Sequence, residues 1–249
     1  MVRKLLQPFY SAWVILSFVV CLLLLFPFFI AVSIPNNAWA RRSIWRIIRP
    51  WSQFWLLIVG MPMRIQGPKP PQRRYVIVAN HISYMDTVVV FSAIPWYFRA
   101  LGKAEMSSMP LLGFIYKQIV IMVKRDSAHN RARSMRLMWR AVKYESSVLV
   151  FPEGTFNETA EPVKELFDGA FRLAINAQTP IFPMIFPDTV DRWHYSHWWA
   201  VWPGRNRAIY LDPIPVDGLT LADVPALKEK VGRILAEALR KAKPGYPMS

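Results

Sequence analysis

The chain has 249 residues, enough for one α/β domain and an appendage. Its net charge is +15, 53% of its residues are hydrophobic, and 11 of them are tryptophan. This combination favours an anionic bilayer over nucleic acid as a partner, and no nucleic-acid-binding motif occurs in the sequence. The single cysteine, Cys21, excludes an internal disulfide.

The first element is an apolar segment. Residues 5–40 contain no charge, and residues 12–34 are long enough to cross a hydrocarbon layer about 30 Å thick. The sequence therefore predicts attachment to a membrane, as a single crossing or as a re-entrant hairpin broken near Pro27. A cleaved signal peptide ending at 38–40 is the rival, but the run is too long for a typical signal. In both attached forms the remaining chain lies in the cytoplasm, because basic residues follow the segment: Arg41, Arg42, Arg46 and Arg49.

These arginines belong to a predicted amphipathic helix. Three of them recur at helical spacing, and apolar residues occupy the other side. We interpret it as an interfacial helix, with ordinary packing on the domain as the alternative. Pro62 and residues 67–71 mark a boundary, which predicts two domains, 1–66 and 67–249. The apolar side comprises Ile44, Ile47, Ile48, Trp51 and Trp55.

Strands and helices alternate after the boundary, which predicts an α/β fold with a largely parallel sheet flanked by helices. The last helix is expected to bury Val224, Leu227, Val231, Ile234, Leu235 and Ala238. The predicted strands are 75–80, 97–101, 119–124, 147–152, 181–186 and 208–211, and the predicted helices are 86–94, 130–145, 169–176 and 223–241.

The turn after the first of these strands carries His81 and Asp86. On one continuous helix, residues five apart lie about 140° apart around the axis, so this pair can meet only across a turn. If it does, the carboxylate accepts one imidazole proton and the other nitrogen can act as a general base. The alternative is a structural turn histidine and a helix N-cap aspartate. The remaining histidines have no carboxylate at this spacing.

A second buried strand ends in Phe151-Pro152-Glu153-Gly154-Thr155. With Asn80-His81-Ile82-Ser83-Tyr84-Met85-Asp86, it resembles the lysophospholipid acyltransferase family of 1-acylglycerol-3-phosphate acyltransferases, whose blocks are N-H-x-S-x-x-D and F-P-E-G-T. Both occur here in the right order, about seventy residues apart. The resemblance implies the glycerolipid acyltransferase fold for 67–249, with a membrane anchor in 1–66.

The resemblance also implies a reaction. A fatty acyl group would pass from acyl-CoA or acyl carrier protein to the hydroxyl of lysophosphatidic acid, at the cytoplasmic face of a bacterial-type inner membrane and without a cofactor or metal. His81 would be the base and Asp86 its partner, and no acyl-enzyme is needed because a thioester is already activated. Asn80 and the backbone near Gly154 are candidates for orienting the substrate or stabilising the oxyanion. Ser83 is expected to be a turn or hydrogen-bonding residue and not a nucleophile. Ser83, Glu153 and Thr155 complete the expected substrate-binding set.

One departure from the family pattern affects the acceptor's phosphate. The residue after F-P-E-G-T is commonly Arg, and here it is Phe156. The phosphate is therefore expected to bind Lys103, Lys124 and Arg125, with solvated surface positions as the alternative. The strand around Pro183 matches the family's fourth block and is expected to shape the acyl pocket.

Other readings stay open. Glycerol 3-phosphate or a lyso-ornithine lipid could replace lysophosphatidic acid, the dyad could hydrolyse a thioester, or the chain could be a non-enzymatic membrane scaffold. One predicted helix has a basic face, which we interpret as a solvated surface. The alternative is a contact with an acidic acyl carrier protein or with lipid headgroups. The face comprises Arg133, Arg136, Arg140 and Lys143. Four tryptophans could enter the membrane interface or cover the core: Trp193, Trp198, Trp199 and Trp202.

Overall fold

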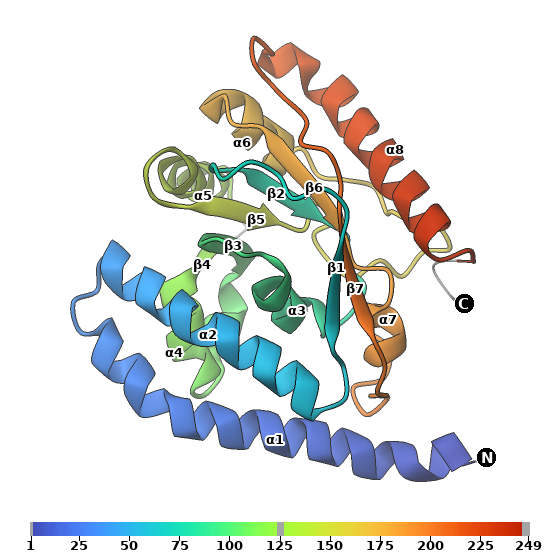
Figure 1. Ribbon diagram of the computed structural model, residues 1–249. Helices are drawn as coiled ribbons and strands as arrows, with labels where there is room; N and C mark the ends of the chain where they lie inside the picture. Colours follow the sequence, from blue (N-terminus) through green and yellow to red (C-terminus); the bar gives the residue numbers. More distant parts are fainter. Residues whose placement is uncertain (1, 124–126, 246–249) are drawn as a thin grey trace. The chain divides into compact units, whose positions relative to one another are not determined.

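The computed structural model of the protein describes residues 2–123 and 127–245. Its strands form a seven-stranded sheet in the order β1-β7-β6-β2-β5-β3-β4 (Figure 1). β2 pairs in parallel with β5 and β6, β3 pairs in parallel with β5 and β4, and β7 is antiparallel to its neighbour β6. The prediction of a largely parallel α/β sheet is therefore confirmed. The strands are β1 Met63–Gln66, β2 Val76–Ala79, β3 Phe98–Lys103, β4 Val120–Val123, β5 Ser147–Val150, β6 Ile181–Ile185 and β7 Asn206–Tyr210.

The helices agree with the predicted alternation, apart from α4 and the four-residue α7, which the sequence analysis missed together with strand β1. The fold forms two compact units: unit 1 is Met1–Ile65, Ile82–Pro95 and Phe186–Ala208, and unit 2 is Gln66–His81, Trp96–Ile185 and Ile209–Ser249. The division into domains 1–66 and 67–249 stays a prediction. The helices are α1 Val2–Ser33, α2 Ala38–Ile58, α3 Asp86–Ala93, α4 Leu112–Ile119, α5 Ala128–Arg140, α6 Gly169–Ala177, α7 Thr189–Arg192 and α8 Val224–Ala242, with short turns of 3₁₀-helix at Ala104–Ser108 and Leu221–Asp223 and of π-helix at Ala141–Glu145.

The register of β2 against β5 brings the two sequence motifs to one edge of the sheet in unit 2. Val78 lies opposite Val150 in this parallel pair, so the residues that follow, 79–81 and 151–153, leave the sheet side by side. Every residue of both strands is buried. The carboxyl ends of neighbouring parallel strands are where α/β folds place their ligand sites.

Helix α8 closes unit 2 by packing on β6 and on α6 (Figure 1). The side chains at its core face recur every three or four residues, as an amphipathic helix requires. Ile234 and Ala238, which were expected in this face, are only half-buried, and Leu239 is buried instead. The buried positions are Val224, Leu227, Val231, Leu235 and Leu239.

Unit 1 contains a helical hairpin formed by α1 and α2, which lie side by side (Figure 1). The prediction of a break near Pro27 is wrong, because α1 continues through this proline to Ser33. Proline costs a helix one hydrogen bond but keeps a helical φ, so it need not end the helix. The chain turns at 34–37 instead. There Asn36 adopts a left-handed φ of 42°, and the side chain of Asn37 accepts a hydrogen bond from the Ala40 backbone N at 3.1 Å to cap α2.

The apolar side of α2 packs against α1 and α3 within unit 1. Ile44, Ile48 and Trp55 are buried, and the Trp55 indole donates a hydrogen bond to Ser17 Oγ at 3.1 Å. Phe18 of α1 lies edge-on to the Trp55 ring at 5.5 Å. These side chains therefore occupy a protein interior, so the alternative of an ordinary packed helix describes this face of α2 and the interfacial interpretation is wrong for it.

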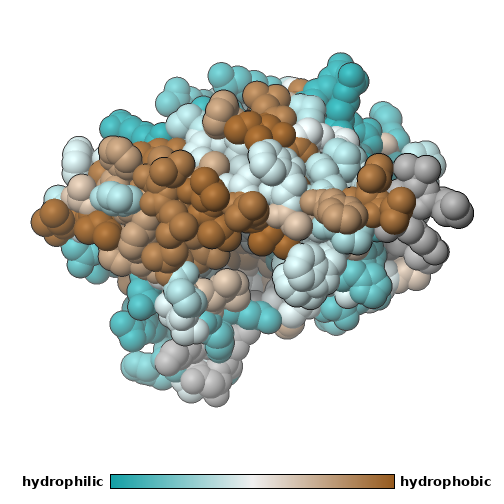
Figure 2. Space-filling view, turned by 90° about the horizontal axis from the view of Figure 1, so that it is seen from below, coloured by the Kyte–Doolittle hydropathy of each residue, from teal (hydrophilic) through white to brown (hydrophobic). Residues whose placement is uncertain are grey.

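The outer side of α1 is exposed and apolar over most of its length. Leu5–Ser33 is long and apolar enough to cross a membrane. Figure 2, which looks onto α1 from below Figure 1, shows the resulting band of hydrophobic side chains. Phe54, Leu57 and Ile58 near the end of α2 are also exposed. The exposed large side chains of α1 are Leu5, Leu6, Phe9, Trp13, Leu16, Val19, Val20, Leu23, Leu24, Phe28 and Ile30.

Candidate active site

His81 follows β2, and the turn after β5 surrounds it on several sides within unit 2. Its imidazole stacks on the ring of Phe151 at a centroid distance of 4.2 Å and an interplanar angle of 16°. The Phe156 ring approaches it at 4.5 Å and 57°. The backbone N of His81 donates to Glu153 Oε1 at 2.8 Å, and its carbonyl accepts from the Asn157 backbone N at 2.8 Å. Both the backbone and the ring of this histidine are therefore held by one turn.

Glu153 supports this arrangement from a buried position. The residue is 1% exposed, and the second oxygen of its carboxylate, Oε2, accepts from the Lys164 backbone N at 3.0 Å. Because both oxygens bind backbone N–H groups, Glu153 has a structural role in this turn. The substrate-binding role expected from the sequence stays a prediction. Gly154, which follows, has a φ of 72°, a left-handed conformation that favours glycine, and its N donates to the Phe151 carbonyl at 3.1 Å.

Lys164 brings a positive charge to the same turn. Its ammonium group donates to Thr155 Oγ1 at 2.7 Å, and Thr155 is exposed. No carboxylate of the described residues forms an ion pair with Lys164. The sequence analysis missed this residue, since it lies nine positions beyond Thr155 in a segment without a motif. Only the folded loop brings it back to the turn.

The basic residues that the sequence predicted as phosphate ligands are Lys103, Lys124 and Arg125. Lys103 is exposed at the end of β3, where its carbonyl accepts from the Tyr116 hydroxyl at 2.9 Å. Burial, with a smaller effect of Glu105, raises the pKa of Tyr116 to about 12, so this hydroxyl remains a donor at neutral pH. Lys124 and Arg125 lie outside the described residues.

Asp86, in unit 1, opens α3 and is fully buried. Its Oδ2 accepts from the backbone N of Ile82 at 2.8 Å and of Ser83 at 2.9 Å. The N-cap position of α3 is Met85, so the alternative of an N-cap role for Asp86 is wrong. The carboxylate instead binds the backbone of the two residues that follow His81 in the chain, and so closes the turn before α3.

Ser83 is a structural residue, as expected. It is fully buried, its hydroxyl donates to the Trp193 carbonyl at 2.6 Å, and it accepts from the Met85 N at 3.0 Å. These contacts support the expected turn role, and the substrate-binding role of Ser83 stays a prediction. Asn80 is buried as well. Among the described residues, no group of three or more His, Cys, Asp or Glu side chains could hold a metal ion.

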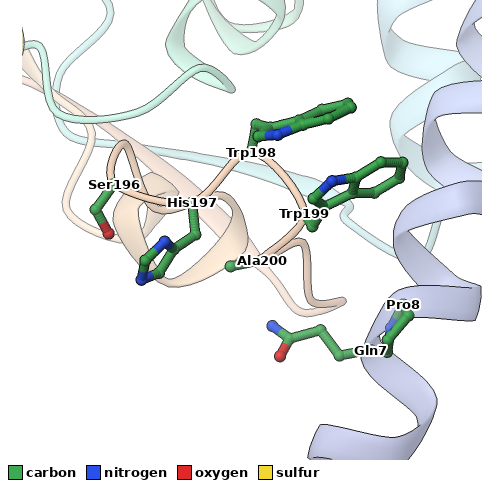
Figure 3. A pocket seen from close by; sticks show the side chains of 7 residues that line it. All are labelled: Gln7, Pro8, Ser196, His197, Trp198, Trp199 and Ala200. Carbon is green, nitrogen blue, oxygen red and sulfur yellow. The ribbon is translucent and has the colours of Figure 1, made fainter.

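Unit 1 also contains a loop rich in tryptophan, residues 193–202, which we name the Trp loop. Ser11 of α1 fixes it by donating to the Trp199 carbonyl and accepting from the Val201 N. A cavity of about 470 Å³ lies between α1 and this loop (Figure 3). Trp198 and Trp199 are 55% and 49% exposed, so they do not cover a core. The cavity is lined by Gln7, Pro8, Ser196, His197, Trp198, Trp199 and Ala200.

Comparisons with known proteins agree on one family. A protein-family model described as Acyltransferase matches residues 63–187, half of the chain. The 1-acyl-sn-glycerol-3-phosphate acyltransferase alpha of Mus musculus is 28% identical over 94% of this chain and 80% of the relative. The beta enzyme of Homo sapiens is 31% identical over 70% of this chain and 61% of that protein.

A solved structure shares the fold. It is the crystal structure of the 1-acyl-sn-glycerophosphate (LPA) acyltransferase, PlsC, from Thermotoga maritima, with a TM-score of 0.78. The similarity covers 98% of this chain and 97% of the other, at 18% sequence identity. The expected glycerolipid acyltransferase fold is therefore confirmed.

The role of Glu153 can be tested with Glu153→Gln. An amide has one acceptor oxygen, so one of the two backbone N–H groups would face an NH₂ group in a buried position. Hydrogen bonds to charged groups contribute about 1.5–3 kcal/mol, which predicts a lower melting temperature and a loss of activity of about ten- to a hundredfold. The exposed Glu158→Gln is the matched control. Unchanged melting and activity in Glu153→Gln would refute the structural role.

Proposed function

The chain belongs to the acyltransferase family, and we propose that it transfers a fatty acyl group from an acyl thioester to the free hydroxyl of lysophosphatidic acid, forming phosphatidic acid. The names of the relatives support this acceptor. The observation that carries the proposal is the placement of His81 at the carboxyl ends of two parallel strands, with its backbone anchored to buried Glu153. An imidazole held this way is suited to act as a base toward a hydroxyl.

The proposed mechanism needs one base. A ring nitrogen of His81 takes the proton of the acceptor hydroxyl while its oxygen attacks the thioester carbonyl. The tetrahedral intermediate then collapses, the carbon–sulfur bond breaks, and the imidazolium returns its proton to the leaving thiolate. Asp86 would accept the proton of the other ring nitrogen and select the tautomer, as the spacing of the pair suggests. Asn80 and the backbone at Gly154 are proposed to stabilise the oxyanion.

The acceptor's phosphate requires a cation. We propose that Lys164 supplies it, with Lys103, Lys124 and Arg125 as the further candidates from the sequence. Lys164 is favoured because its ammonium group is fixed on Thr155 of the turn that holds His81, and because no described carboxylate neutralises it. A cation on the turn that holds the base would orient a phosphate-bearing acceptor relative to the imidazole.

The donor could be acyl-CoA or acyl carrier protein, since both present the same thioester. A carrier protein is acidic and would need a basic surface such as the exposed face of α5. On this face Arg133, Arg136 and Arg140 are exposed, whereas the Lys143 ammonium group donates to the Ala177 carbonyl at 3.2 Å. We keep the solvated-surface interpretation for α5 and propose acyl-CoA as the first donor to test.

We propose that unit 1 binds the cytoplasmic face of a bacterial-type inner membrane without crossing it. The exposed apolar side of α1 would enter one leaflet, and Trp198 and Trp199 would lie at the headgroup level, where indoles are enriched. A full crossing is disfavoured by the hairpin. Because α2 packs along α1, crossing would carry its four arginines into hydrocarbon, at a cost of about 2.5–3.5 kcal/mol or more each.

Product analysis tests the reaction and its base. The purified protein, given labelled acyl-CoA and lysophosphatidic acid, should form labelled phosphatidic acid. His81→Ala should lower this activity by about a hundred- to ten-thousandfold, and Asp86→Asn by about a hundredfold or more, because the ring loses its orientation and tautomer. His129→Ala and Asp217→Asn are exposed controls. Release of free fatty acid alone would favour the thioester hydrolase, and activity above about a tenth in His81→Ala would reject the dyad.

Lys164→Ala tests the phosphate contact. Charge-assisted contacts contribute about 1.5–3 kcal/mol, so the KM for lysophosphatidic acid should rise about ten- to a hundredfold while the KM for acyl-CoA stays constant. Acylation of monoacylglycerol, which lacks the phosphate, should not change. Lys103→Ala tests the earlier candidate, and the exposed Lys230→Ala is the control. A KM effect in Lys103→Ala but not in Lys164→Ala would reverse the assignment.

The membrane proposal predicts a dependence on the exposed arginines of α2. Replacing Arg42 and Arg46 by Gln should weaken binding to anionic vesicles about thirtyfold, since each basic side chain near such a surface contributes about 1 kcal/mol. Binding to zwitterionic vesicles should not change. The control replaces Arg133 and Arg136 on α5 by Gln, which removes the same charge from another exposed face. Equal losses for both pairs in vesicle co-sedimentation would show that net charge, and not this face, controls binding.

A further inference from the structure

Two phenylalanine rings in unit 2 pack on the His81 imidazole. Phe151 lies nearly parallel to one side at 4.2 Å, and Phe156 leans on the imidazole at 4.5 Å with an interplanar angle of 57°. The two phenylalanines come from opposite ends of the same turn, one just before Pro152 and one just after Thr155. The turn therefore wraps around the ring and not only around the backbone.

The ring contact of Phe156 is independent of the backbone anchors. Glu153 and Asn157 hold the main chain of His81 through hydrogen bonds that involve no atom of the Phe156 side chain. Asn157 also fixes the position of its neighbour Phe156, because it is buried and its side-chain amide donates to the Glu161 carbonyl at 2.8 Å. Removing the Phe156 ring should therefore leave the backbone of His81 in place.

A histidine that acts as a base needs its ring held in one orientation, so that the same nitrogen always faces the substrate hydroxyl. Rotation about χ2 of histidine has broad minima, so the backbone alone does not set the plane of the imidazole. Aromatic rings that pack on the imidazole restrict that rotation. When the ring gains a proton, its positive charge also meets the negative face of the stacked Phe151 ring.

We infer that Phe156 is a positioning residue that holds the His81 imidazole in its reactive orientation. This inference rests on the proposed function, in which His81 is the base. It gives Phe156, which stands where the family commonly has Arg, a role in positioning the base and not in binding phosphate. The positive charge for the acceptor comes from Lys164, farther along the loop.

Kinetics of Phe156 variants test the inference. Phe156→Leu should lower kcat about tenfold and change both KM values less than about twofold, because the ring acts on the proton transfer and not on binding. Phe156→Tyr, which keeps an aromatic face, should restore kcat to within about threefold of the wild type. Phe156→Arg should lose at least as much kcat as Phe156→Leu. Tyr144→Leu, which removes an exposed ring that lies edge-on to Trp139 at 5.7 Å, is the control.

A spectroscopic measurement separates positioning from folding. In protein with ¹⁵N-labelled histidine, the His81 signals are those that disappear in His81→Ala. Phe156→Leu should move them from the shifts of one tautomer toward the average of two, and should remove the ring-current shift of the imidazole protons. Phe156→Tyr should restore both. The inference would be overturned by a wild-type kcat in Phe156→Leu or by a kcat in Phe156→Arg above that of the wild type. A loss of kcat in Phe156→Leu that Phe156→Tyr does not restore would also overturn it.

The same series distinguishes the two failures. If His81→Ala stays active, the proposed function fails, whatever the Phe156 variants do. If His81→Ala is inactive and Phe156→Leu has wild-type kcat, the base stands and only the positioning role fails.

Discussion

The buried carboxylate of Glu153 connects the parts of the candidate active site in unit 2. One oxygen binds the backbone of His81 beyond β2, and the other binds the backbone of Lys164. The carboxylate of a residue that is 1% exposed is stable only when its oxygens are paired, so the loop must return to complete the second bond. That return brings the Lys164 ammonium group to Thr155. A single buried charge therefore determines where the base and the cation lie.

A different constraint shapes unit 1. The apolar side of α2 is used twice, against α1 and against α3, so it is unavailable to lipid. The apolar surface that remains belongs to α1 and to the end of α2, with Trp198 and Trp199 exposed in the Trp loop. Because α1 pairs with the arginine-rich α2, its length and hydrophobicity alone do not predict a crossing. Deep insertion of α1 would require the hairpin to open or the arginines of α2 to enter the hydrocarbon. A shallow, lateral position in one leaflet avoids both costs.

Much of this protein could be predicted from its sequence, because the strongest signals are local. Buried strands followed by polar turns, as at Val76–Ala79 and Ser147–Val150, alternate with amphipathic helices such as α8, and this alternation predicts a parallel sheet. Two spaced motifs predicted the family, and in the structure the parallel pairing of β2 with β5 brings these motifs to one edge of the sheet. The weaker elements failed for the same reason: four-residue β1 and eight-residue α4 carry too little periodicity to be recognised.

The sequence by itself determined the sheet, the family and the identity of the candidate base, since these depend on residues close together in the chain. Only the tertiary structure decided what each motif residue contacts. Glu153 proved to support backbone, α2 turned its apolar side inward, and Lys164 and Phe156 became neighbours of the turn that holds His81. The physical reason is that hydrophobic periodicity specifies which side of an element is buried, but not against which partner. The partners follow from how loops close and how buried charges are paired, and those depend on the whole fold.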